Sequence, residues 1–200
     1  MKYGSLTLVA GPMFAGKTND LIKEILFRSY FSETERRSIR VFKLALDNRY
    51  DRDCIVSHDR AGVEAVCVSG ADDIDSNGAD FVFIDEIQFF MKPYFSGDML
   101  DVVRTMRAEG ADVFCSGLDV DYLGRAFEIT ASLMAEASEV RRLHASCDIC
   151  GAPATRTSRL GISSRRFVPG TDDVYRPMCI DHWYQDLASR PETGSVGDGR

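Results

Sequence analysis

An eight-residue stretch near the start of the chain constrains its fold more than any other feature. The stretch, Gly11-Pro12-Met13-Phe14-Ala15-Gly16-Lys17-Thr18, fits the pattern G-x-x-x-x-G-K-[ST] of a phosphate-binding loop. In such a loop, the glycines let the backbone turn its N–H groups toward phosphate oxygens. The lysine contacts the β- and γ-phosphates, and the threonine hydroxyl ligates Mg²⁺. We therefore expect Lys17 and Thr18 to hold the phosphates and the metal ion of a bound nucleotide.

The residues on either side of the loop support this assignment. Residues 5–10 form an apolar, partly β-branched run that predicts a buried parallel strand. From residue 19 to residue 27, apolar residues recur with helical spacing, and we expect this helix to end near residues 28–32. A strand, a glycine turn and a helix in this order aim a helix amino terminus at an anion. A chance match in an ordinary turn is therefore disfavoured.

A second strand candidate ends in two adjacent carboxylates. The apolar run 81–84 is followed by Asp85 and Glu86. In nucleotide-binding loop proteins, an aspartate at the end of a nearby strand holds Mg²⁺, directly or through water, and we assign this role to Asp85. Glu86 leaves the sheet at the same edge and could act as a general base. The alternative for Glu86 is a structural or solvated carboxylate.

Further elements complete an α/β pattern without internal repeats. We expect strands at residues 40–46, 63–68, 111–116 and 139–145, a helix within 97–110, and packing of 127–134 against the core. The polar run 47–53 follows one of these strands, at the edge where open α/β sheets bind ligands. It is either a solvated loop or a mobile lid over the phosphate site.

Two pairs of soft ligands near the carboxyl terminus predict a metal site. Cys147 and Cys150 form one C-x₂-C pair, and Cys179 and His182 form a C-x₂-H pair. Four such ligands close a tetrahedral zinc site with no open position, which is typical of structural zinc. The metal would clamp both ends of the intervening residues 151–178, which show little apolar periodicity and no core of their own. The rival is a redox dithiol, which does not call for a second pair ending in histidine.

Composition limits the classes of protein that this chain could be. With 200 residues, 44% of them hydrophobic, it suits one domain with a small appendage. A net charge of −7 argues against a nucleic-acid-binding surface, and no apolar run fits a signal peptide or a membrane span. We expect a cytoplasmic protein with reduced or metal-bound cysteines. The glycine-rich tail, residues 191–200, is expected to be disordered.

The combination of motifs, in this order, resembles the zinc-containing (type II) thymidine kinases from about residue 5 to residue 184. The motifs that carry the resemblance are the loop 11–18, Asp47-x-Arg49, Ser57-His58-Asp59, the run from Asp85 to Phe90, Gly117-Leu118-Asp119 and the cysteine and histidine set. The resemblance implies a RecA-like P-loop kinase domain with a mostly parallel sheet at 1–143. A small zinc-binding lasso domain is implied at 144–190, followed by the tail. It further implies transfer of the γ-phosphoryl group of ATP to the 5′-hydroxyl of thymidine, in a homotetramer that dTTP could inhibit.

The resemblance also implies roles for individual residues. It assigns ATP contacts to residues 11–18, to Asp47, Asn48 and Arg49, and to Asp85, Glu86, Ile87 and Gln88. It assigns nucleoside contacts to Met13, Phe89, Leu118 and Tyr122, and to the lasso residues Thr157, Phe167, Val168, Pro169, Gly170 and Tyr175. Glu86 matches the catalytic base, and Thr18 and Asp85 belong to the magnesium site.

The sequence departs from the family pattern at Ile87, at Tyr122 and at residues 167–169. These departures leave the chemistry intact but put strict preference for thymidine in question. Deoxyuridine, which lacks only the 5-methyl group, could be accepted, because one methyl group in an apolar pocket discriminates by only about 1–3 kcal/mol. Two other functions compete. A zinc-bearing ATPase that acts on DNA is opposed by the acidic composition. A non-catalytic nucleotide-binding protein is opposed by the presence of Lys17, Thr18, Asp85 and Glu86 together.

Overall fold

The computed structural model describes residues 2–35, 37–45, 54–56, 62–161 and 174–190. A central sheet of six strands runs in the order β5-β2-β6-β7-β1-β8, and all of its strand pairs are parallel. The strands are β1 (Leu6–Ala10), β2 (Ile39–Leu44), β5 (Val66–Val68), β6 (Phe81–Ile84), β7 (Asp112–Gly117) and β8 (Glu139–Arg142). The expected α/β fold with a mostly parallel sheet is confirmed.

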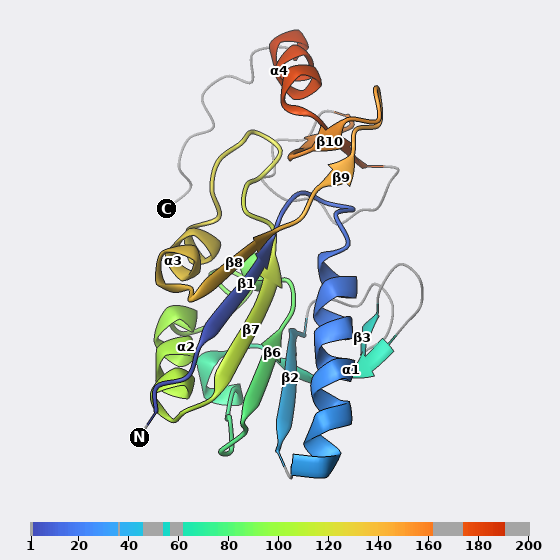
Figure 1. Ribbon diagram of the computed structural model, residues 1–200. Coiled ribbons are helices and arrows are strands. Elements are labelled where there is room, and N and C mark those ends of the chain that lie inside the picture. The colour runs from blue at the N-terminus through green and yellow to red at the C-terminus, as the bar shows by residue number, and fades with distance from the viewer. Residues whose placement is uncertain (1, 36, 46–53, 57–61, 162–173, 191–200) are drawn as a thin grey trace.

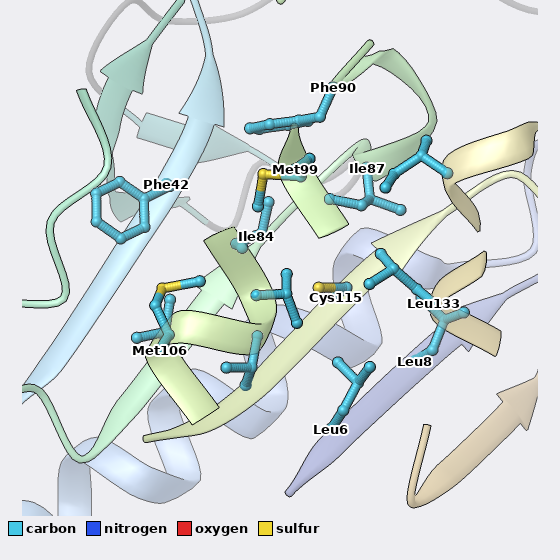
Figure 2. Packing of buried hydrophobic residues seen from close by; sticks show 14 of the residues in the cluster. Leu6, Leu8, Phe42, Ile84, Ile87, Phe90, Met99, Met106, Cys115 and Leu133 are labelled. Carbon is cyan, nitrogen blue, oxygen red and sulfur yellow. The ribbon is translucent and has the colours of Figure 1, made fainter. Parts of the chain in front are cut away.

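Helices cover both faces of this sheet. Helix α1 (Lys17–Glu35) lies on one side, and α2 (Met99–Ala108) and α3 (Glu128–Glu136) lie on the other (Figure 1). Helix α1 buries Leu21, Ile22 and Ile25 against one sheet face. The larger core on the opposite face is shown in Figure 2, where Met99, Met106 and Leu133 gather with strand residues. This two-sided burial explains why the central strands are apolar throughout rather than alternating.

Three expected boundaries are wrong. Helix α1 continues to Glu35 instead of ending near 28–32. At the expected end, Arg28 pairs with Glu24 one turn earlier at 2.9 Å and lies over the Phe81 ring, and the Phe27 ring packs against that of Phe31. The expected strand 63–68 is two strands, β4 (Gly62–Glu64) and β5. Strand β4 pairs antiparallel with β3 (Cys54–Val56), whereas β5 joins the central sheet. The expected strand 139–145 is likewise divided into β8 and β9 (Ala145–Ser146).

A small lobe, residues 145–161 and 174–190, follows the sheet. It holds β9 paired with β10 (Pro153–Ala154), β11 (Arg156–Arg159) paired with β12 (Tyr175–Met178), and α4 (Ile180–Ser189). Figure 1 places β9, β10 and α4 beyond the carboxyl ends of β1 and β7. The lobe has a small apolar cluster of Cys147, Ala154, Met178, Cys179 and Trp183, to which the described part of the segment 151–178 contributes Ala154 and Met178.

Two short 3₁₀ helices, η1 (Ala71–Asp73) and η2 (Ile87–Phe89), follow the carboxyl ends of β5 and β6. Helix η2 therefore begins directly after the paired carboxylates. Among the described helices, none combines the length and the apolarity needed to span a bilayer.

Candidate active site

The phosphate loop connects β1 directly to α1. Gly11 has φ 156° and Gly16 has φ 79°, conformations that favour glycine. A Cβ at Gly11 would lie 2.3 Å from the Leu143 carbonyl oxygen, so that no larger residue fits there. Lys17 begins the helix, and its Nζ donates to the Pro12 carbonyl at 2.7 Å. The lysine ammonium and the amino terminus of α1 therefore both lie at the loop, where they can attract an anion.

Asp85, the predicted magnesium ligand, lies just after β6 and contacts the end of this loop. The Thr18 hydroxyl donates to Asp85 Oδ2 at 3.0 Å, and the Ser116 hydroxyl donates to Asp85 Oδ1. Asp85 is only 6% exposed. Burial, followed by the charge of neighbouring Glu86, raises the pKa of Asp85 to about 6. The structure thus brings together Thr18 and Asp85, two oxygen ligands of the kind that Mg²⁺ prefers.

Glu86 turns away from the strand in a left-handed conformation. Its φ of 54° and ψ of 42° are rare for a residue with a side chain. The Gln88 amide nitrogen donates to Glu86 Oε2, and Gln88 Oε1 accepts from the Leu118 backbone N–H at 2.9 Å. Ile87 and Gln88 are buried in η2. Gln88 therefore links the candidate base to Leu118, a residue expected to contact the nucleoside.

The other expected nucleoside contacts come from both parts of the chain. The Met13 backbone N–H donates to the Thr157 hydroxyl of β11 at 3.0 Å, which joins the phosphate loop to the small lobe. Tyr122 and Tyr175 are buried, and Phe89 packs edge-on against Tyr94 with ring centroids 5.8 Å apart. The expected contacts at residues 47–49 and at residues 167–170 lie outside the described residues.

Sequence reasoning assigned no role to several residues that contact the candidate site residues, among them Ser116 and Arg159. Ser116 holds Asp85. In the sequence, Ser116 is a polar residue near the carboxyl end of an apolar strand, which could have drawn attention to it. Only the pairing of β6 with β7 shows that its partner is the Asp85 carboxylate. Arg159 lies over the Tyr122 ring, with Cζ 3.7 Å from the ring centroid. No sequence pattern pointed to this contact between two distant segments.

The four expected soft ligands converge in the small lobe. The ligand atoms of Cys147, Cys150, Cys179 and His182 all lie within 4.8 Å of one another. Cys150 Sγ is 3.9 Å from Cys179 Sγ, and Cys179 Sγ is 3.2 Å from His182 Nδ1. Burial raises the pKa of Cys147, but backbone N–H groups of Cys179, Ile149 and Cys150, with His182, outweigh it and bring the pKa to about 6. These thiols are free, and the group could hold a metal ion.

Comparisons with known proteins agree on one family. A family model described as thymidine kinase matches residues 4–183. The thymidine kinase of Rhodothermus sp. (strain ITI 518) is 37% identical over 178 residues, which cover 88% of this chain and 79% of that protein. The thymidine kinase of Pseudothermotoga lettingae is 36% identical over 192 residues, covering 94% of this chain and 98% of that protein.

Proposed function

The chain belongs to the thymidine kinase family, and we propose that it transfers the γ-phosphoryl group of ATP to the 5′-hydroxyl of thymidine. The products are dTMP and ADP, and the setting is cytoplasmic salvage of deoxynucleosides. The observation that carries this proposal is the convergence of Lys17, Thr18, Asp85 and Glu86 at the carboxyl edge of the sheet. Phosphoryl transfer depends mainly on positioning and charge stabilisation, for which this arrangement is suited.

The phosphate side of the reaction falls to the loop and to α1. Lys17 exchanges its bond to the Pro12 carbonyl for the ATP phosphates, whose charge it stabilises. The Thr18 hydroxyl and the Asp85 carboxylate fit Mg²⁺, because they are hard oxygen ligands already 3.0 Å apart. Bound there with ATP, Mg²⁺ would neutralise phosphate charge. Ser116 keeps Asp85 directed toward Thr18.

Glu86 accepts the proton of the attacking 5′-hydroxyl. Its carboxylate follows Asp85 by one residue, and the Gln88 amide fixes its orientation. The strained left-handed backbone at Glu86 is consistent with a residue positioned for function rather than for packing. Since Gln88 also binds the Leu118 backbone, the base and the nucleoside pocket are aligned by one side chain.

The nucleoside pocket is proposed to form between the kinase domain, residues 1–143, and the zinc domain, residues 144–190. The Met13–Thr157 hydrogen bond supports this location of the pocket, because it brings the phosphate loop and the small lobe together. Leu118, Tyr122 and Tyr175 supply apolar walls in the proposed pocket. Deoxyuridine is proposed as a second substrate, since loss of one methyl contact costs only about 1–3 kcal/mol.

Zinc is the metal proposed for the cysteine and histidine group, with Cys147, Cys150, Cys179 and His182 as ligands. In a tetrahedral site with Zn–S bonds of about 2.3 Å, neighbouring ligand atoms lie roughly 3.5–3.8 Å apart. The separations of 3.9, 3.6 and 3.2 Å among these ligands are close to that spacing. Bound zinc would supply structural stability rather than chemistry, because all four positions are taken by the protein.

A homotetramer is proposed, and an exposed apolar strip on α1 supports assembly. Leu26, Phe27, Tyr30 and Phe31 are exposed on this helix. Adjacent exposed aromatic residues favour a protein contact. Light scattering of the purified protein tests the assembly state. We further propose that dTTP, the end product of the phosphorylation series that dTMP enters, inhibits by occupying the nucleoside site.

One experiment tests the proposed reaction directly. A panel of deoxynucleosides is incubated with ATP and Mg²⁺, and ³¹P NMR assigns the position of the new phosphate. We expect thymidine 5′-monophosphate as the main product, with slower turnover of deoxyuridine. ADP release that requires DNA and not a nucleoside would overturn the proposal in favour of a DNA-dependent ATPase.

A further inference from the structure

The 118–127 loop after β7 is held by the single tryptophan of the chain. The Trp183 indole N–H of α4 donates to the Tyr122 carbonyl at 3.0 Å. A Cβ at Gly124, whose φ is 77°, would lie 2.9 Å from Trp183 Cη2, so that the loop backbone packs closely on the indole. Both Trp183 and Tyr122 are buried. Because His182 precedes Trp183, the helix that carries a candidate metal ligand also seats this loop.

Two arginines flank the ring of the same tyrosine. Arg159 Cζ of β11 is 3.7 Å from the Tyr122 ring centroid, and Arg190 Cζ, just after α4, is 5.3 Å away. Guanidinium groups within about 6 Å of an aromatic ring are attracted to its electron-rich face. Tyr122 is therefore held through its backbone by Trp183 of α4, and through its ring by Arg159 of β11 and by Arg190 at the carboxyl end of α4.

Arg190 connects these segments through a polar network. Its NH2 donates to Asp186 Oδ2 at 2.6 Å, to Ser158 Oγ at 2.8 Å and to the Arg159 carbonyl at 2.9 Å. Ser158 in turn donates to the same Asp186 oxygen at 2.7 Å. A single guanidinium thus joins α4 to β11 beside the Tyr122 ring. Such charge-assisted, partly buried bonds are stronger than neutral ones.

The network lies next to residues assigned to the nucleoside, and it reaches the phosphate loop through the Thr157–Met13 hydrogen bond. Ser158 directly follows Thr157, which binds the Met13 backbone. Moving β11 would therefore shift Thr157 and release one side of Tyr122. Lys17 and Asp85, by contrast, lie at the start of α1 and just after β6, so that a change at the Met13 contact acts on them indirectly, through the loop backbone. Disturbing the network should consequently affect the two substrates unequally.

We propose that Arg190 is a positioning residue for the nucleoside pocket: it fixes β11 and α4 against Tyr122, so that the small lobe sets the pocket wall formed by the 118–127 loop. The residue acts through Tyr122 and Thr157 and does not touch the reacting atoms. This inference rests on the proposed nucleoside kinase function, and it adds a residue to which neither the sequence pattern nor the family resemblance assigns a role.

Three variants of the full-length, metal-loaded protein test the assignment. Arg190→Met keeps the aliphatic length and removes the guanidinium, Arg190→Lys restores a charge without the planar fork, and Arg104→Gln is the matched control. Arg104 pairs with Glu136 on the surface of α2 and α3. We expect Arg190→Met to raise the thymidine KM about tenfold, while kcat and the ATP KM stay within about twofold. Arg190→Lys should recover part of the loss, and the control should match wild type.

Trp183 gives a second readout that does not depend on turnover. Since the chain has one tryptophan, its emission reports on the surroundings of Trp183, which include the Tyr122 carbonyl and Gly124. We expect Arg190→Met to shift the emission of the nucleoside-free protein to longer wavelength, as the indole becomes more exposed. If Arg190→Met does not fold, Ser158→Ala removes one bridge of the network, and we expect it to raise the thymidine KM about threefold.

Several results would overturn the inference. These are a thymidine KM within twofold of wild type in Arg190→Met (or in Ser158→Ala where Arg190→Met does not fold), an equal rise in the ATP KM, or no recovery with lysine. Unchanged Trp183 emission in Arg190→Met would also reject it. Failure of the proposed function is a different result, because it would appear as absence of deoxynucleoside turnover in the wild-type protein, whatever the emission showed.

Discussion

The Thr18 hydroxyl donates to the Asp85 carboxylate at 3.0 Å and so joins the first turn of α1 to the carboxyl end of β6. These residues are far apart in the sequence and meet because β1 and β6 flank β7 in the sheet. Asp85 is buried, and Ser116 of the intervening strand satisfies its other oxygen. The hydrogen bonds from Thr18 and Ser116 offset only part of the cost of burying the Asp85 charge, at the position proposed for Mg²⁺.

The buried carboxyl predicts a pH-dependent difference between wild type and Asp85→Asn. Burial first, and then the charge of Glu86, raises the pKa of Asp85 from 3.8 to about 6. A carboxyl with a higher pKa in the folded state favours folding when protonated, and that advantage is lost as pH rises from about 4 to about 6. Asparagine does not titrate. Without nucleotide and Mg²⁺, the melting temperature of wild type should therefore fall relative to Asp85→Asn across this window.

Thermal melts of both proteins at matched ionic strength, between pH 4 and pH 8, measure that difference. The melting temperature of wild type relative to Asp85→Asn should be highest at the acidic end and should level off above about pH 6, and titrations of groups that do not interact with Asp85 cancel because they are common to both proteins. A difference that does not change with pH would show that the Asp85 pKa is not raised by the fold.

Lys17→Ala should abolish most of the activity without unfolding the protein. The lysine ammonium donates to the Pro12 carbonyl and contributes little to either hydrophobic core. Its proposed role is to stabilise phosphate charge in the transition state. Removing one preorganised donor typically lowers kcat about 10²–10³-fold, and we expect a similar decrease here. Steady-state kinetics and circular dichroism measure the two effects. Near-normal turnover in a folded variant would contradict the assignment of the phosphate loop.

The purified protein should contain about one zinc ion per chain, because four ligands leave no open position. Cys150→Ser should weaken metal retention and raise the thymidine KM, since the small lobe carries Thr157 and seats Tyr122 through Trp183. Metal analysis and Trp183 emission provide readouts besides activity. Active enzyme without zinc, or with a Cys147–Cys150 disulfide in its place, would contradict the metal assignment.

Cys67→Ser is the matched control for that prediction. Cys67 is an exposed cysteine of β5, outside the small lobe. Its substitution should leave zinc content, Trp183 emission and the thymidine KM unchanged, whereas a general effect of removing a thiol would appear in both variants.

The parts of the site that sequence reasoning predicted are those encoded by local spacing. The glycines around Lys17 and Thr18 dictate a loop before a helix, and an apolar strand ending in Asp85 needs no knowledge of its neighbours. The parts that it missed depend on which segments meet. Ser116 reaches Asp85 only because β7 lies beside β6, and Arg190 reaches Tyr122 only because the small lobe folds back on the 118–127 loop.

Element boundaries failed for a related physical reason. The expected strand 63–68 looked continuous, but its halves pair with different partners on either side of Ala65. Helix α1 was expected to fray near residues 28–32, but Arg28 packs on the Phe81 ring of the central sheet there. Local propensity is a weak guide wherever pairing or packing with a distant segment decides the outcome.

Glu86→Gln separates chemistry from binding more sharply than any other variant. Glutamine keeps the size of the side chain and a hydrogen-bonding partner for Gln88, but it cannot accept the proton of the 5′-hydroxyl. General-base help is worth about 10²–10⁴-fold, so kcat should fall by that factor while thymidine and ATP bind with nearly unchanged affinity. Single-turnover phosphoryl transfer and calorimetric binding measure the two quantities.

Asp85→Asn is the comparison that shows whether the effect belongs to the base. The activity that Asp85→Asn loses should be partly recovered by raising the Mg²⁺ concentration, because the Asp85 oxygen beside Thr18 is proposed to hold the metal. Glu86→Gln should not respond to Mg²⁺ in this way, since it lacks the proton acceptor rather than the metal ligand. If Glu86→Gln turned over within a few-fold of wild type, Glu86 would be a structural carboxylate, and Asp47 would be the first alternative base to test.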